Sequence, residues 1–159
     1  MKYNAIIRRS INPSDFYNGT RLLFSVHKKS WFKSIWVVLD ENKVEVFRFS
    51  ICSFLWYFRI NILKQSLSRV ITIKDVKKNS SIIVSNDILT IKSKFKIFGK
   101  FEAYFFLNDR LAGQAFETAS LLQGIKYELE FIEDDEYCYY FTLLFAMYSV
   151  GFANVATVT

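Results

Sequence analysis

The chain has 159 residues, of which 52% are apolar and 18% aromatic, and its formal net charge is +6. One proline and five glycines exclude a linker-rich or disordered chain. Residues 1–100 contain 19 basic and 6 acidic side chains, a net charge of +13, whereas residues 101–159 contain 2 and 9, a net charge of −7. This polarity is typical of a protein that meets an anionic surface with one end. It is equally compatible with two ends that neutralise each other within the fold or an oligomer.

The first 20 residues are expected to form an irregular N-terminal arm, because Pro13 and the pair Asn18-Gly19 are turn signals. No long apolar run follows the first charges, so no signal peptide is expected. A first strand is predicted at Leu22–Val26, and a basic loop follows it at His27–Lys33.

A β-hairpin is the clearest feature of the first half. Its predicted strands are Ile35–Leu39 and Val44–Phe49, joined by a polar turn at residues 40–43. Simple alternation places Arg48 on one face of the second strand, with Val44 and Val46, and Glu45 on the other face, with Phe47 and Phe49.

Basic side chains gather at the open end of this hairpin. The predicted anion or head-group-binding residues are Lys28, Lys29, Lys33 and Arg48. They would hold the phosphate of a head group by charge-assisted hydrogen bonds. Trp31 and Phe32 stand beside them and would contact a membrane or a partner. A solvated loop whose two aromatic rings fold back onto the core is equally compatible with the pattern.

An aromatic-rich apolar stretch follows at Ile51–Leu63, with Arg59 as its single charge. Thirteen residues are too few to span a bilayer as a helix. The stretch is compatible with a buried strand, a short core helix or a loop that dips into a membrane. Cys52 in this stretch and Cys138 near the C-terminus do not form a metal-binding spacing, which favours two reduced, buried thiols.

Four further strands are predicted, at Val70–Val76, Ser81–Val84, Ile88–Phe98 and Phe101–Leu107. In the third of them, a second basic surface is formed by Lys92, Lys94 and Lys96, which share one face at a period of two. Aromatic neighbours such as Phe95 could stack on single-stranded nucleic acid. We favour a structural interpretation, in which the rings pack in the core and the lysines protect a sheet edge from aggregation.

A helix is predicted over residues 109–123. Its apolar stripe at intervals of three and four residues consists of Leu111, Ala112, Ala115, Phe116, Ala119 and Leu122. Asn108 or Asp109 would cap its start, and Gly124 would end it. A strand at Ile125–Phe131 is expected next. The acidic turn Glu133–Glu136 follows and is interpreted as solvated in preference to a cation site.

The last 23 residues, 137–159, contain no charge. That length could span a membrane as a helix. Four tyrosines, several hydroxyl groups and an acidic flank weigh against a span. A buried helix, a buried strand pair and a surface that docks on a partner are the alternatives.

Two segments resemble the pleckstrin-homology (PH) domain superfamily, which includes bacterial PH-like and GRAM-like domains. SWFKSIWVVLDENKVEVFRF (Ser30–Phe49) is similar to the second and third strands of that family, and FEAYFFLNDRLAGQAFETASLLQG (Phe101–Gly124) to its last strand and helix. Phe116 stands where PH helices usually carry a tryptophan, and Ile35 stands where phosphoinositide-binding members carry an arginine. The resemblance implies a mainly β, α+β fold: a PH-like antiparallel barrel or sandwich capped by one C-terminal amphipathic helix. The chain would then divide into an arm at 1–20, a PH-like domain at 21–124 and an apolar extension at 125–159.

Catalytic chemistry is not indicated. His27 is the single histidine, so a paired-histidine metal site is impossible within one chain, and phosphate-binding glycine loops and nucleophile motifs are absent from the sequence. We therefore predict no catalytic residue, no metal, no cofactor and no small-molecule substrate.

The sequence predicts a non-catalytic adaptor that docks on an anionic membrane surface or a protein partner through its basic loop. The alternative is a structural subunit of a larger assembly, with residues 51–63 and 137–159 as buried interfaces. A nucleic-acid-binding domain ranks third. Reduced thiols favour an intracellular location, with membrane association as part of the adaptor hypothesis.

Overall fold

The computed structural model describes residues 1–8, 12–30, 34–54, 57–74, 80–94, 100–121, 124–133 and 135–156. Within these ranges the chain forms twelve strands and one helix. The strands are β1 (Lys2–Arg8), β2 (Ser14–Asn18), β3 (Arg21–Lys28), β4 (Ile35–Asp40), β5 (Glu45–Phe54), β6 (Tyr57–Gln65), β7 (Ile71–Ile73), β8 (Ser81–Val84), β9 (Asp87–Lys94), β10 (Glu102–Leu107), β11 (Arg110–Leu121) and β12 (Gly124–Phe131). The helix is α1 (Tyr137–Ala156).

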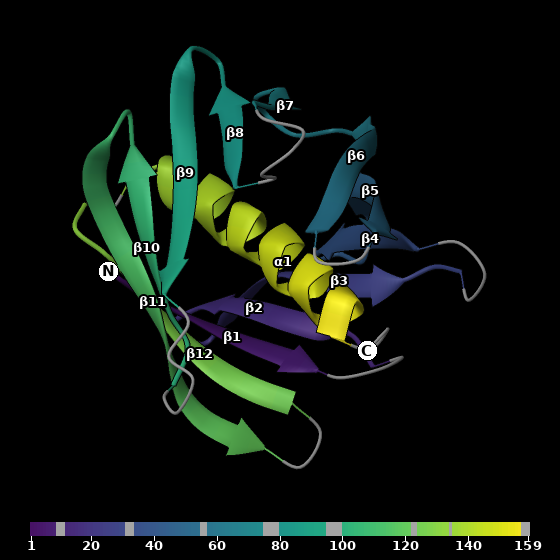
Figure 1. Ribbon diagram of the computed structural model, residues 1–159, viewed down its shortest axis with the longest axis horizontal. Helices are drawn as coiled ribbons and strands as arrows, with labels where there is room; N and C mark the ends of the chain where they lie inside the picture. The colour runs from purple at the N-terminus through teal and green to yellow at the C-terminus, as the bar shows by residue number, and fades with distance from the viewer. Residues whose placement is uncertain are drawn as a thin grey trace.

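All twelve strands belong to one antiparallel sheet, in the order β6-β5-β4-β3-β2-β1-β12-β11-β10-β9-β8-β7. Neighbours in the chain are neighbours in the sheet, with one exception. β6 and β7 follow each other in the chain but are the two edge strands of the sheet. The first and last strands of the chain, β1 and β12, pair instead along seven residues in the middle of the sheet. The sheet curves around α1, so that the architecture is a nearly closed barrel with the helix inside it (Figure 1).

The strands follow the alternation that a barrel requires, with every second side chain directed inward. On β1, Tyr3, Ala5 and Ile7 are buried and alternate with partly or fully exposed neighbours. Leu129 and Phe131 on β12 continue the same inner layer. The inner faces of the strands and α1 together form one hydrophobic cluster.

α1 fills the centre of the barrel. Its residues Phe141–Met147 are all at most 2% exposed, a helix that is apolar on every side and is surrounded by sheet. Among the interpretations of residues 137–159, the structure therefore supports the buried helix over the part that it describes. Among the described residues, no helix combines the length and apolarity that crossing a bilayer needs.

The predicted helix at 109–123 is wrong, because most of this segment forms β11. Asn108 and Asp109 have φ angles of 48° and 66°, which is the left-handed pair of a two-residue type I′ hairpin turn and not a helix cap. Leu107 and Arg110 pair across that turn. The apolar spacing is misleading because β11 contains two irregularities, at Ala112 against β10 and between Glu117 and Ala119 against β12. Each shifts the alternation of the strand, so the apolar stripe also fits a helix.

The expected irregular arm at residues 1–20 is also wrong, since this segment contains β1 and β2. The strands expected between residues 22 and 107 are confirmed as elements. β7 leaves out the described residues Val70 and Lys74, and the predicted strand Ile88–Phe98 is described only as far as Lys94, where β9 ends. The stretch Ile51–Leu63 consists of the end of β5 and most of β6, paired as a hairpin whose residues 55 and 56 lie outside the described ranges. The sheet therefore runs through all three of the segments into which the sequence was divided.

The prediction of a mainly β, antiparallel barrel with one C-terminal helix is confirmed, although the helix is α1 and not residues 109–123. Both cysteines are free. Cys138 is buried, as expected, whereas Cys52 is exposed, because its neighbour Ile51 occupies the inward position on β5.

Candidate anion-binding face

Basic residues and acidic residues lie on different parts of the barrel. The basic half of the chain supplies β3–β6, and the acidic half supplies β10–β12 on the other side of α1 (Figure 1). Residues 46–74 contain no aspartate or glutamate at all. Residues 21–65, which include β3–β6, contain eight basic and three acidic side chains, so basic side chains predominate in this part of the barrel.

Arg48 is the centre of this face. It pairs with Val37 on β4 and Lys64 on β6, and its neighbours Phe47 and Phe49 are fully buried. Because successive side chains of a strand point to opposite faces, Arg48 lies on the outside of the barrel. Its side chain is 30% exposed.

Two β-bulges flank Arg48 and bring charged residues to it. Between β4 and β5, Val38 pairs with Phe47 but Leu39 pairs with Glu45, so Val46 is the extra residue. Between β5 and β6, Arg48 pairs with Lys64 but Phe49 pairs with Ile62, which makes Leu63 the extra residue. A shift of one residue moves a side chain to the opposite face. Both Glu45 and Lys64, which simple alternation would direct inward, therefore join Arg48 outside.

The result is a cluster of three cations around one carboxylate. Arg48 Nη2 donates a 2.8 Å hydrogen bond to Glu45 Oε2 and lies 2.7 Å from Glu45 Oε1. Lys64 Nζ is 3.8 Å from Oε1, and Lys29 Nζ is 3.9 Å from Oε2. We call Lys29, Glu45, Arg48 and Lys64 the Glu45 cluster. Its formal charge is +2.

The cluster leaves polar atoms unsatisfied. Arg48 Nε is buried and has no hydrogen-bond partner among the described residues. Glu45 Oε1 is in ion-pair contact with Arg48 and Lys64, but none of the described residues donates a hydrogen bond to it. Glu45 meets Arg48 through a single guanidinium nitrogen, and not through the two parallel bonds of a fork-like pair. The hydrogen bond from Arg48 is the main cause that lowers the pKa of Glu45, and Lys64 and Lys29 lower it further. Glu45 is therefore ionised at neutral pH.

The structure brings together some of the predicted head-group residues and separates others. Lys29 and Arg48 meet in the Glu45 cluster. Lys28 pairs with Trp36 across β3 and β4, and its Nζ lies 5.6 Å from the centre of the Trp36 ring. Lys33, with Trp31 and Phe32, lies outside the described residues. Lys64 was missed because only the bulge next to Leu63 places it beside Arg48.

The second basic surface is described only in part. Lys92 on β9 is exposed, and its Nζ lies 4.4 Å from the centre of the Phe106 ring on β10. Lys94 ends β9 and pairs with Glu102, but its side chain is not described. Lys96 and Phe95 lie outside the described residues. No cluster comparable to that around Glu45 is assembled here from the residues that the structure describes.

His27 lies on β3 and not in a solvated loop. The ring nitrogen Nε2 is 2.8 Å from Ser25 Oγ, in hydrogen-bond contact along the same strand. His27 is half-buried and pairs with Val37, so it shares the outer face with Arg48. Among the described residues, no group of three histidine, cysteine or acidic side chains is placed to hold a metal ion, and this search includes the described part of the acidic turn before α1.

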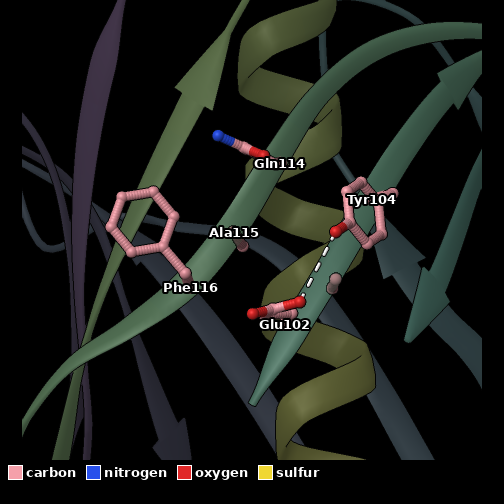
Figure 2. A pocket seen from close by; sticks show the side chains of 6 residues that line it. Glu102, Tyr104, Gln114, Ala115 and Phe116 are labelled. Carbon is pink, nitrogen blue, oxygen red and sulfur yellow. Dashed lines mark hydrogen bonds between the residues drawn. The ribbon is translucent and has the colours of Figure 1, made fainter. Parts of the chain in front are cut away.

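A shallow hollow of about 230 Å³ lies over β10 and β11 (Figure 2). It is lined by Glu102, Ala103, Tyr104, Gln114, Ala115 and Phe116. Tyr104 donates a 3.4 Å hydrogen bond to Glu102 across its floor. Ligand pockets usually enclose about 300–1,000 Å³, so this hollow is below the usual size. It also lies on the acidic side, away from the Glu45 cluster.

Comparison with known proteins gives one structural likeness. No family model and no curated protein matches this chain. A solved structure of a protein from Arabidopsis thaliana aligns with 99% of this chain and 91% of its own, at 11% sequence identity and a TM-score of 0.49.

Proposed function

We propose that this protein is a non-catalytic binding module that docks on an anionic membrane surface through the outer face of β3–β6. The observation that carries the proposal is the Glu45 cluster, in which one carboxylate faces three cations. Cations near an anionic leaflet contribute roughly 1 kcal/mol each. The acidic β10–β12 would face away from the membrane and orient the molecule by repulsion.

The test is co-sedimentation of the full chain with vesicles of phosphatidylcholine alone or mixed with phosphatidylserine. Replacing Lys29 and Lys64 by glutamate should reduce binding to the anionic vesicles by about thirtyfold or more. The matched control is R110E/K126E, which changes the net charge equally at two exposed positions of β11 and β12. Equal loss in both double variants would show that only total charge matters and would refute docking through β3–β6.

The PH resemblance supports this proposal through one segment only. Within the described residues, Ser30–Phe49 forms a hairpin of β4 and the start of β5, the fourth and fifth strands of this chain, where the resemblance implies a second and a third strand. The second segment, Phe101–Gly124, forms β10 and β11, whereas the resemblance implies a strand followed by a helix. The charge distribution and not the family likeness is therefore the basis of the proposal.

A structural subunit of a larger assembly is less well supported. That hypothesis rests on the aromatic stretches 51–63 and 137–159 as interfaces, yet Ile51, Phe58 and Ile60 face the core, and α1 is buried in it. An acidic protein partner would meet the same basic face as a membrane. Binding to nucleic acid would depend steeply on salt and would compete with anionic vesicles, so a filter-binding assay with single-stranded RNA separates it from lipid docking.

A further inference from the structure

The Glu45 carboxylate occupies the position on the basic face where an external anion would bind. Arg48, Lys29 and Lys64 all approach Glu45, and no second carboxylate shares the cluster among the described residues. A carboxylate carries one charge and two acceptor oxygens, whereas a phosphate group presents more oxygens and up to two charges. One carboxylate therefore offsets only one of the three positive charges, and the cluster keeps a formal charge of +2 that a phosphate could balance.

We propose that Glu45 is a built-in competitor, and that a lipid phosphate displaces it from Arg48 when the protein docks. This inference rests on the proposed membrane docking and adds its ligand class and its regulation. Arg48 uses one nitrogen for Glu45, and its Nε has no acceptor among the described residues. A phosphate would engage the guanidinium through two parallel hydrogen bonds, the geometry that arginine favours.

The local backbone supports a displaceable Glu45. Glu45 is the first residue of β5, directly after the exposed turn at residues 41–44. Its outward position depends on the bulge at Val46. Lys29 and Lys64 reach it only at 3.9 and 3.8 Å, and their side chains are 51% and 53% exposed. These two lysines can follow an incoming phosphate without disturbing the core.

The decisive variant is E45Q, with E41Q as its matched control. Both replacements remove one negative charge from the β4–β5 hairpin, but Glu41 lies in the exposed turn and pairs with Arg21, outside the Glu45 cluster. Binding is measured on vesicles of phosphatidylcholine with and without phosphatidic acid, at constant salt. E45Q should bind phosphatidic-acid vesicles about fivefold more tightly than the original protein, the effect of one charge near a leaflet. E41Q should change binding by less than twofold.

Each outcome separates this inference from the proposed function. If the original protein binds and E45Q binds equally or less tightly, Glu45 holds the basic side chains in place and does not compete with the lipid phosphate. The inference is then refuted, while membrane docking stands. If neither protein binds vesicles, both proposals fail. Circular dichroism and thermal unfolding of E45Q, with E45A as a second variant, establish that the fold is retained.

Inorganic phosphate distinguishes a lipid from a soluble source. Millimolar phosphate should leave vesicle binding unchanged beyond its contribution to ionic strength, which a chloride control at equal strength measures. Release from the vesicles by phosphate, and not by chloride, would assign the cluster to a free phosphate compound and overturn the lipid assignment.

Discussion

The hydroxyl of Tyr137, the first residue of α1, donates a hydrogen bond to the carboxylate of Asp87, the first residue of β9. Asn108 Nδ2 donates a second bond to Asp87, 2.6 Å long, from the β10–β11 turn. Arg69, on the connection between β6 and β7, pairs with Glu136 and lies over the Tyr137 ring. The start of the central helix is thus bonded to Asp87 on β9 and to Arg69 between β6 and β7, and Asp87 in turn connects it to the β10–β11 turn.

Replacing Tyr137 by phenylalanine should lower the melting temperature by a few degrees, because Asp87 loses its main partner. The Tyr137 hydrogen bond is also the largest cause that lowers the pKa of Asp87 below its ordinary value of 3.8. A carboxylate with a lowered pKa stabilises the fold above its unfolded pKa, and this contribution is lost as the pH falls through the folded value. In urea unfolding at different pH values, Y137F should therefore lose less free energy of unfolding at acid pH than the original chain. D87N should remove the contribution of Asp87 to this loss. An unchanged acid profile in D87N would contradict this assignment.

Tyr139 should cause a loss of stability at alkaline pH. Its ring packs edge-on against Phe24, with centroids 5.6 Å apart, and burial raises its pKa to about 12. Between the ordinary value of 10.0 and the folded value, the unfolded chain has lost a proton that the folded chain retains. The free energy of unfolding then falls with rising pH, by about 2–3 kcal/mol over this range. The free energy of unfolding of Y139F, measured by guanidinium titration at each pH, should fall less steeply as the pH rises. A pH profile equal to that of the original chain would contradict the assignment.

Gly151 on α1 allows a close approach between the helix and β6. A Cβ atom at this position would lie 2.3 Å from the ring of Phe58. Alanine gains about 1 kcal/mol in helix propensity over glycine, whereas overpacking of a core costs about 1–3 kcal/mol. We expect the contact to dominate, so G151A should lower the free energy of unfolding. S149A, also on α1, is the control and should be close to neutral in the same denaturation experiment.

Substitutions in the β10–β11 turn distinguish a hairpin from a helix, because glycine at position 109 should stabilise a hairpin turn and destabilise a helix. Asp109 has a φ of 66°, a conformation that glycine adopts without strain. D109G should therefore stabilise the protein by about 0.5–1 kcal/mol, since Asn-Gly is the preferred type I′ pair. D109A, which keeps the Cβ atom, should be no more stable than the original. If alanine stabilised and glycine destabilised, the segment would be helical.

Most strands could be read from the sequence because alternation and turn residues coincide in them. Ser81–Val84 and β12 are examples, and each has buried residues at every second position over most of its length. Residues 109–123 could not be assigned in this way. Small residues such as Ala115 satisfy a strand and a helix equally well, and the partners that select the strand, β10 and β12, become visible only in the sheet.

The candidate site could be predicted in part for a related reason. Lys29 and Arg48 were found because they are close to one hairpin. The outward positions of Glu45 and Lys64 depend on two bulges. Each bulge inserts one residue into a strand, so the side chains beyond it point to the opposite face. A bulge results from the pairing of two strands, and neither strand shows it alone. The central helix was ambiguous because a bilayer and the inside of a barrel both select an uncharged segment.

The position of α1 in the chain also has a consequence for biosynthesis. All twelve strands precede it, so they leave the ribosome before the side chains that fill their inner face. Pairing of β1 with β12 likewise joins residues 116–128 positions apart, which favours slow closure and a long-lived open intermediate. Until the helix emerges, the nascent sheet has exposed aromatic rings and unpaired edges, the features that chaperones bind. Ribosome-stalled chains that end before Tyr137 should therefore bind a holdase chaperone, and chains extended past α1 should release it.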